Sequence, residues 1–202
     1  MTPVRSLGPR VLTGRYIALE PLSDAHRNGL RAAADDPSIF RYMPLDGSGE
    51  NFPIWWDESA HAHASGERMV FAVRRLADGV IVGSSSYGNI VPAHARVEIG
   101  WTWYAKAAQA SAVNPEAKLL LMAYAFETAG YHRVELKTDS TNARSRAAIL
   151  KLGASEEGTL RGHMWMPRGY WRDTVYYSVL ADEWPGVRAG LEARLRAFSS
   201  GE

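Results

Sequence analysis

A short loop in front of a helix is the first place where this sequence could do chemistry. Residues Gln109 to Val113 read "QASAV", and Asn114-Pro115-Glu116 follows them as a helix-start signal. Asn favours the cap, Pro the first helical position, and Glu the positive end of the helix dipole. The first N–H groups of a helix have no partner within it, so a helix start attracts anions. The loop is therefore a candidate phosphate site; the alternative is that Asn114 only caps a core helix.

Phosphate-binding loops usually use glycine, and this loop has none between Tyr104 and Pro115. Alanine keeps its backbone N–H, and only proline would remove that donor. A left-handed backbone at Ala110 or Ala112 would cost about 1–2 kcal/mol, because these residues carry a Cβ. If the loop binds a phosphate, its affinity is the quantity that the alanines would lower.

A second candidate lies in "TDSTNARSRAAILKLGA", Thr138 to Ala154. On a helix that starts near Asn142, the side chains of Asn142, Ser145 and Ile149 share one face. Asn142 and Ser145 are short polar groups at a strand–helix turn, where they can meet a ligand. The alternative is structural: Asn142 caps the helix and Ser145 is a surface residue.

Composition limits the chemistry that these residues can perform. The chain has 202 residues, a formal net charge of +1 and no cysteine. A group transfer must therefore use another nucleophile or pass directly between two bound substrates. The interspersed charges argue against a dedicated nucleic-acid surface. No run of about 18 apolar residues predicts a membrane span, and the first ten residues have no apolar core of a secretory signal, so a cytoplasmic protein is expected.

These candidates must be positioned by the surrounding elements. Strands are predicted over Leu12–Leu22, on both sides of a turn at Ala77-Asp78-Gly79, over Ala95–Tyr104 and over His132–Asp139. Helices are expected over Asp24–Asp36, Phe52–Glu67, Asn114–Gly130 and Thr141–Gly153. A hairpin about Pro167-Arg168-Gly169 and a helix near Asp182–Phe198 complete the chain. Three adjacent strands followed by strand–helix alternation predict one α/β domain, a mixed sheet with helices on both faces.

Alternation along the strand that ends at Tyr104 predicts two faces. Val97, Ile99, Trp101 and Trp103 should share one, and Glu98, Gly100, Thr102 and Tyr104 the other.

The two candidates occur together in a known pattern. The chain resembles the GCN5-related N-acetyltransferase (GNAT) superfamily, and within it the RimJ/RimL-like ribosomal-protein N-acetyltransferase branch. Three stretches carry the resemblance: "LTGRYIALEPLSDAH", the run from "EIGWTWY" to "LKLGA", and "RGYWRDTVYYSVL". They span nearly the whole chain in order, so residues 1–202 are expected to form a single GNAT acetyltransferase domain. The implied fold is a central, mostly antiparallel sheet with one splayed parallel strand pair.

The resemblance implies acetyl-CoA as cosubstrate and no metal. It implies that the pantetheine arm lies between the Val97–Tyr104 and Arg133–Thr138 strands, with Asn142 as its hydrogen-bond partner. Ser145 would lie near the sulfur and protonate the departing thiolate. The implied diphosphate site comprises Gln109, Ala110, Ser111, Ala112 and Val113.

The family chemistry is direct attack of a neutral amine on the thioester. Glu98 is the predicted general base, because it lies on the strand beside the cofactor; the alternative is a surface carboxylate at a strand edge. A backbone N–H near Trp101 or Thr102 would stabilise the oxyanion. Asp173 and Tyr176 are weaker catalytic candidates, and Arg172-Asp173 is an alternative structural pair.

The remaining candidate residues have weaker functional signals. Arg144, Arg146 and Lys151 could meet the 3′-phosphate of the cofactor. His61 and His63 have no convincing further metal ligands nearby, and Trp55-Trp56 suits core packing.

The acceptor is expected to be a protein or peptide N-terminus or a small-molecule amine. The segments that would shape its pocket, 41–67 and 162–171, contain aromatics and no strong acidic cluster, which disfavours a polycationic substrate. Two other hypotheses remain open at this stage: a non-catalytic acyl-CoA-binding or regulatory module, and a partner-binding domain that uses the aromatic hairpin. A homodimer through the terminal hairpin or the last helix is a further hypothesis.

Overall fold

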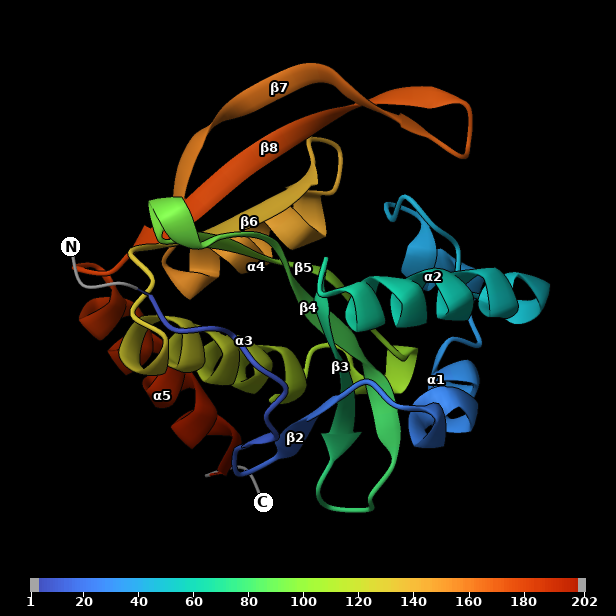
Figure 1. The fold of residues 1–202 in the computed structure, drawn as a ribbon, viewed down its shortest axis with the longest axis horizontal. Coiled ribbons are helices and arrows are strands. Elements are labelled where there is room, and N and C mark those ends of the chain that lie inside the picture. Colours follow the sequence, from blue (N-terminus) through green and yellow to red (C-terminus); the bar gives the residue numbers. More distant parts are fainter. Residues whose placement is uncertain (1–3, 200–202) are drawn as a thin grey trace.

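The computed structural model describes residues 4–199 and contains one eight-stranded sheet. Its strand order is β1-β2-β3-β4-β5-β6-β8-β7, and the only parallel neighbours in it are β5 and β6 (Figure 1). This is the predicted mixed, mostly antiparallel sheet. The strands are β1 Leu12–Thr13, β2 Ile17–Pro21, β3 Met69–Arg75, β4 Ile81–Val91, β5 Arg96–Tyr104, β6 Arg133–Asp139, β7 Ser155–Met166 and β8 Tyr170–Leu180.

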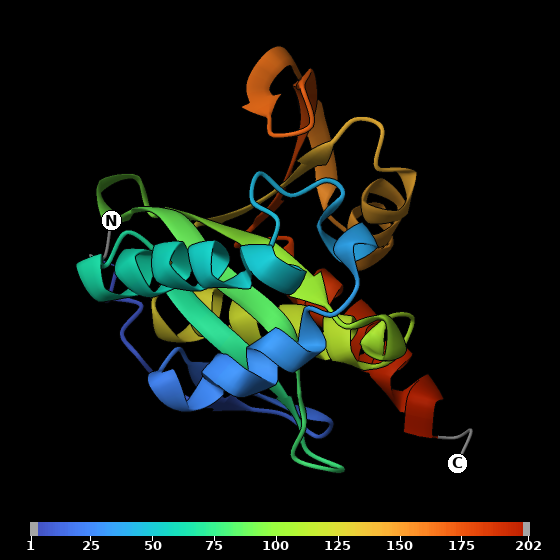
Figure 2. The same cartoon turned by 90° about the vertical axis from the view of Figure 1, so that its right-hand side faces the viewer.

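Helices cover both faces of the sheet, as predicted. On one face, α3, α4 and α5 pack over a large apolar cluster; on the other, α1 and α2 pack over a smaller one (Figures 1 and 2). The α-helices are α1 Arg27–Ala33, α2 Phe52–Ser65, α3 Val113–Ala123, α4 Ala143–Leu152 and α5 Trp184–Ser199. Short 3₁₀ turns lie at Asp24–His26, Pro37–Phe40, Gly49–Asn51, Pro92–His94 and Lys106–Ala108, and a π-helical turn at Tyr124–Thr128 extends α3.

The predicted strand Leu12–Leu22 is wrong in one respect: it is two strands with a turn between them. The turn is held by a buried carboxylate far away in the sequence. Glu116 of α3 accepts hydrogen bonds of 2.7–2.8 Å from the backbone N–H groups of Arg15, Tyr16 and Ile17. A Cβ at Gly14 would lie 2.4 Å from the Glu116 carboxyl carbon, so only glycine fits beside it. Glu116 thus lies in the first turn of α3, as predicted, and also anchors a distant turn.

The predicted faces of β5 are also wrong beyond residue 100, because the strand contains a β-bulge. Gly100 pairs with Ser86 and Trp103 with Ser84, so Trp101 and Thr102 together oppose a single residue of β4. Trp101 has a φ of +50°, in the left-handed region. The extra residue reverses the alternation.

The reversal moves the end of β5 to the opposite faces. Tyr104 packs in the cluster under α3 together with Val97 and Ile99, whereas Trp103 packs in the cluster under α2. Thr102 therefore lies on the opposite face from Glu98.

The parallel strands β5 and β6 separate soon after they meet. Their pairing covers only Arg96–Glu98 against Arg133–Glu135. Beyond Glu98, the edge of β5 that faces β6 has no strand partner within the described residues. The predicted splayed pair is therefore present, and the backbone donors along this part of β5 are open to a ligand.

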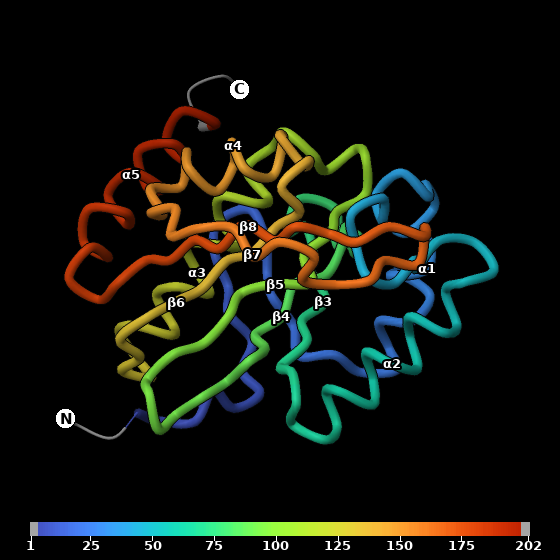
Figure 3. Tube along the Cα trace, turned by 90° about the horizontal axis from the view of Figure 1, so that it is seen from above, coloured from blue at the N-terminus to red at the C-terminus, as the bar shows by residue number. Residues whose placement is uncertain are grey.

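The hairpin of β7 and β8 arches over the sheet toward the segment before α2 (Figures 1 and 3). At its turn, Arg168 donates hydrogen bonds to the carbonyl oxygens of Phe40, at 3.1 Å, and Arg41. These bonds join the predicted hairpin to the predicted acceptor segment. No helix of the described residues is both long and apolar enough to cross a membrane.

Candidate active site

The start of α3 has an open set of backbone donors. The helix begins at Val113, with Ala112 at the N-cap position. Alanine has no side-chain acceptor, and Asn114 lies one residue inside the helix, so no side chain at the N-cap makes a capping hydrogen bond. The predicted capping role of Asn114 is therefore wrong. Within residues 4–199, no acceptor partners the N–H groups of Ala110, Ser111, Ala112 and Asn114. These amides, at the positive end of a helix, are suited to an anion.

The "QASAV" loop is shaped by local bonds. The hydroxyl of Ser111 donates to the carbonyl of Ala108 at 2.7 Å and accepts the N–H of Val113 at 3.3 Å. Ala110 has a φ of +57°, whereas Ala112 is right-handed with a φ of −65°. Of the two alanines that replace the usual glycines, only Ala110 therefore has a strained, left-handed backbone.

Gln109 connects this loop to α4. Its side chain donates to the carbonyl of Tyr104 at 2.9 Å and accepts from Arg144 at 2.5 Å. Arg144 is thereby held beside the open amides. Arg146, another predicted phosphate contact, is bound instead to Tyr177, Ser140 and Glu156. Lys151 is exposed on α4.

The start of α4 is arranged as predicted. Asn142 caps the helix, accepting the N–H of Ser145 at 3.1 Å through its Oδ1. The Asn142 amide nitrogen and the Ser145 hydroxyl have no partner among the described residues. Both side chains are half-buried at the end of β6. Their free polar atoms can therefore meet a ligand in the opening between β5 and β6.

Below the β5 bulge lies a buried amine that the sequence reasoning missed. Lys118 of α3 is only 7% exposed, and its Nζ donates to the Thr102 hydroxyl at 3.1 Å. Thr102 also shares a hydrogen bond of 2.7 Å with Ser85. Burial lowers the pKa of Lys118 to about 8. The position of Lys118 in the helical pattern of the sequence does not distinguish it from an exposed lysine.

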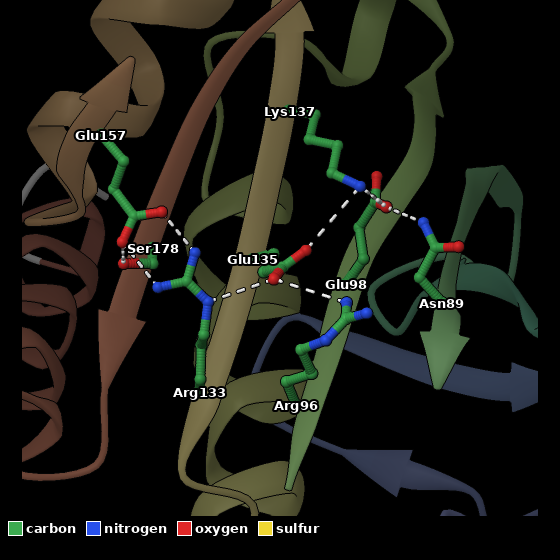
Figure 4. Close-up of polar contacts among 8 residues, drawn as sticks. All are labelled: Asn89, Arg96, Glu98, Arg133, Glu135, Lys137, Glu157 and Ser178. Atoms are coloured by element: carbon green, nitrogen blue, oxygen red, sulfur yellow. Dashed lines mark hydrogen bonds and ion pairs between the residues drawn. The ribbon is translucent and has the colours of Figure 1, made fainter. Parts of the chain in front are cut away.

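Glu98 lies on the other face, in an ion pair. Its Oε2 accepts from Lys137 at 2.7 Å and from Asn89 at 2.5 Å (Figure 4). It is 7% exposed, so it is not the surface carboxylate of the alternative prediction. Burial alone would lower the pKa of Lys137, but the charge and hydrogen bond of Glu98, with Tyr176, raise it overall. The second oxygen of Glu98, Oε1, lies over Gly100, where an added Cβ would be 2.9 Å away.

This ion pair is one end of a longer network across β5, β6 and β7 (Figure 4). Lys137 also faces Glu135 at 3.7 Å. Glu135 accepts from Arg133 at 3.1 Å, and Arg133 in turn binds Glu157. The hydrogen bonds of Glu157, the largest cause, raise the pKa of Arg133. Such a network holds β5 and β6 together where they are paired, directly before they separate.

A second polar pair lies where β6 ends. The hydroxyl of Tyr170 donates to Asp139 Oδ2 at 2.7 Å, and Thr141 donates to Oδ1 through both its N–H and its hydroxyl. Burial and the Asp139 carboxylate raise the pKa of Tyr170 to about 12. Burial would raise the pKa of Asp139, but the hydrogen bonds from Thr141 and Tyr170 lower it overall.

Tyr170 also lines a groove with a volume of about 330 Å³ between the β7–β8 turn and the segment before α2. Most of its walls are apolar. The lining residues are Phe40, Arg41, Met43, Leu45, Asp46, Asn51, Ile54, Met166, Pro167, Arg168 and Tyr170. The groove thus lies between the two segments, 41–67 and 162–171, from which the sequence predicts an acceptor pocket.

The two weaker candidates differ in their surroundings. Asp173 accepts the N–H of Gly162 at 2.7 Å, so the predicted alternative pair of Asp173 with Arg172 is not formed. Tyr176 lies under Lys137, with 4.6 Å between the Nζ and the ring centre. Among the described residues, no group of three or more acidic, His or Cys side chains could hold a metal ion. His63 accepts the N–H of Val70, and its burial lowers its pKa.

Comparison with known proteins identifies the family. The model of the GNAT acetyltransferase domain matches residues 17–155. The chain belongs to the GNAT family. The match includes β5, the start of α3 and the start of α4, which is where the GNAT resemblance predicts the cofactor site.

Individual GNAT relatives agree with this result. The putative ribosomal N-acetyltransferase YdaF of Bacillus subtilis is 35% identical over 113 residues, which are 56% of this chain and 61% of YdaF. A GCN5-related N-acetyltransferase of Brucella melitensis has a TM-score of 0.89 and 31% identity, over 96% of this chain and 89% of that one. RimJ of Mycobacterium smegmatis shares the fold, with a TM-score of 0.75 and 23% identity over 92% and 91% of the chains. The predicted superfamily is confirmed, and the YdaF match agrees with the RimJ/RimL-like branch.

Proposed function

We propose that residues 1–202 act as a single N-acetyltransferase domain that transfers acetyl from acetyl-CoA directly to a primary amine. The acceptor would be a protein or peptide N-terminus or a small-molecule amine. One observation carries the proposal: the unpaired edge of β5 runs directly to the open amides at the start of α3. A thioester-bearing arm and a diphosphate need these two features side by side.

The chain's own groups fit acetyl-CoA. Its diphosphate would accept hydrogen bonds from the open amides of Ala110, Ser111, Ala112 and Asn114, with Arg144 beside them. Its pantetheine arm would lie along β5 between the splayed strands and accept from the free amide nitrogen of Asn142. The shared fold of mycobacterial RimJ, whose structure is described as a complex with CoA-disulfide, supports this placement.

Transfer requires a neutral amine, a polarised carbonyl and a protonated leaving group. Glu98 would take the proton of the amine through Oε1, directly or through water, since Lys137 and Asn89 occupy Oε2. The β5 bulge would direct a backbone N–H of Trp101 or Thr102 at the oxyanion. Ser145, whose hydroxyl is free, would protonate the thiolate. The C–N bond would form first and give the oxyanion, and the C–S bond would break as the oxyanion collapses, so that the amine proton passes to Glu98 and CoA leaves as a thiol.

The experiment is thiol release from acetyl-CoA with a panel of peptide and small-molecule amines. Glu98→Gln should lower kcat by about 100-fold, the low end of general-base effects, and Ser145→Ala by less. The matched control is Asp57→Asn, an exposed carboxylate on α2, which should leave kcat unchanged. Acetyl-CoA binding without thiol release for any amine would instead support a non-catalytic acyl-CoA-binding module.

A further inference from the structure

One buried cation at the acceptor side of the site has no partner. Arg172 of β8 is 7% exposed, and its Nε is fully buried without a hydrogen bond. Its guanidinium makes no hydrogen bond or ion pair with any of the residues that the structure describes. Leaving a buried charge unpaired costs several kcal/mol, so such a group is usually completed by a ligand when it lies at a binding site.

The carboxylates near Arg172 are already engaged. Asp139 and Glu98 both act on its charge electrostatically, and burial lowers its pKa. Asp139 uses Oδ1 for Thr141 and Oδ2 for Tyr170. Glu98 uses Oε2 for Lys137 and Asn89. Neither reaches Arg172 within ion-pair distance, so its five N–H donors remain for another oxygen.

The position of Arg172 on the strand places it between the groove and Glu98. Tyr170 and Arg172 are two residues apart on β8, so their side chains share a face. Tyr170 lines the groove and reaches Asp139, the last residue of β6. β6 pairs with β8 only as far as Thr174, so Arg172 lies beyond the end of β6, at the opening.

We propose that Arg172 is the specificity-determining group of the acceptor site, and that it binds an oxygen on the carbon next to the amine-bearing carbon. This inference rests on the proposed function. With the amine at Glu98, the guanidinium can donate hydrogen bonds to a carboxylate or a carbonyl oxygen of the same molecule. The acceptor is then an α-amino compound, either a free amino acid or the N-terminal residue of a peptide. The apolar walls contributed by Met43, Leu45 and Met166 favour an apolar side chain on it.

The test uses four acceptors that share one side chain: leucine, leucinamide, a short peptide with N-terminal leucine, and 3-methylbutylamine, which lacks the α-carbonyl group. If Arg172 binds a carbonyl oxygen, Arg172→Met should lower kcat/KM at least tenfold for leucinamide and the peptide. If it binds a carboxylate, the same loss should occur for leucine. In both cases the change should lie chiefly in KM. The value for 3-methylbutylamine should change less than twofold. Variant-to-wild-type ratios are compared because the pKa values of these amines differ, and the ratio cancels that difference.

Arg172→Lys is the second variant, and it should restore part of the lost discrimination because it keeps the charge. Acetyl-CoA affinity and the unfolding temperature of each variant show whether the fold and the cofactor site are intact. A larger loss with leucine than with leucinamide assigns a carboxylate, and the reverse assigns a peptide carbonyl. The role of Arg172 would be overturned if Arg172→Met lowered kcat/KM equally for all four acceptors. It would also be overturned if the wild-type protein had its highest kcat/KM with 3-methylbutylamine after correction for amine ionisation. Absence of thiol release with every amine would instead refute the proposed enzymatic function.

Discussion

The starts of α3 and α4 differ although the sequence predicted an Asn cap at both. At α4, Asn142 accepts the N–H of Ser145 and completes the helix end. At α3, Asn114 lies inside the helix, and the amides of Ala110, Ser111 and Ala112 have no partner among the described residues. A helix end that its own side chain completes is structural first, whereas one left open can bind an anion. In the proposed complex, the start of α3 would bind the charged diphosphate, and the start of α4 would make a neutral hydrogen bond to the pantetheine arm.

The largest expected effect follows from placing a negative charge at each end. Ser111→Asp should weaken acetyl-CoA binding by at least about 100-fold, because a carboxylate would repel the diphosphate. The substitution also removes the hydroxyl that donates to the Ala108 carbonyl, so the unfolding temperature of the variant is measured beside its affinity. The matched control is Ala143→Asp in the first turn of α4, with an expected loss of less than about threefold. Calorimetric titration measures both, and equal losses would refute the division between the two ends.

The buried lysine of α3 and the exposed lysine of α4 should differ in their effect on the pH dependence of stability. Between about pH 8, the pKa of folded Lys118, and 10.5, the unfolded chain holds a proton that the folded protein has lost. The free energy of unfolding should therefore rise with pH across this window, by up to roughly 3 kcal/mol, and the penalty is complete below it.

Urea unfolding at pH 7.5 and 9.5 checks this expectation. Lys118→Met should remove most of the rise, and Lys151→Met on α4 should leave it in place. If Lys118→Met shows the same rise as the wild-type protein, the buried ammonium is not its source.

Removing each Asn side chain compares the caps directly. Asn142→Ala should destabilise the protein by about 1 kcal/mol through the lost cap. Asn114→Ala should change stability by less than about 0.5 kcal/mol, the usual range for substitutions away from such features. Denaturant unfolding of both variants is the measurement. A larger loss for Asn114→Ala would mean that α3 is capped in solution after all.

The smallest effect concerns the alanines of the α3 loop. Because the left-handed backbone at Ala110 is present without a ligand, Ala110→Gly should raise the free energy of unfolding by about 1 kcal/mol. Acetyl-CoA affinity should then change little. Ala112→Gly relieves no strain and should lower stability by about 0.5–1 kcal/mol. Tighter acetyl-CoA binding by Ala110→Gly would show that the strain or crowding arises on ligand binding instead.

Local signals explain why α4 could be predicted and much of the α3 region could not. The α4 helix is bounded by an Asn cap and by Gly153 in a left-handed conformation, and both act on neighbouring residues. The β5 bulge is different. Its left-handed residue is Trp101, whose ring packs on Gly88 and under Arg68, 4.9 Å from the ring centre. Contacts with residues distant in the sequence thus stabilise a left-handed backbone at Trp101, which the alternating pattern of the strand does not predict.

The same distinction applies to the polar residues of the site. Glu116 lies in the first turn of its own helix as expected, but its bonds to a turn about 100 residues earlier in the chain were not predicted. Lys118 and Arg172 are buried only because of what packs over them. The family pattern predicted which segments would form the proposed cofactor site. It could not predict which charges in that site are left without partners, because pairing depends on tertiary contacts.

The most direct test of the central claim is calorimetric titration of the wild-type protein with acetyl-CoA and with S-acetylpantetheine, which lacks the diphosphate. If the open start of α3 holds the diphosphate, acetyl-CoA binds at a single site and acetylpantetheine binds at least 100-fold more weakly. Ser111→Asp should then have no effect on acetylpantetheine binding. Equal affinity for the two compounds, or no acetyl-CoA binding at millimolar concentration, would contradict the account.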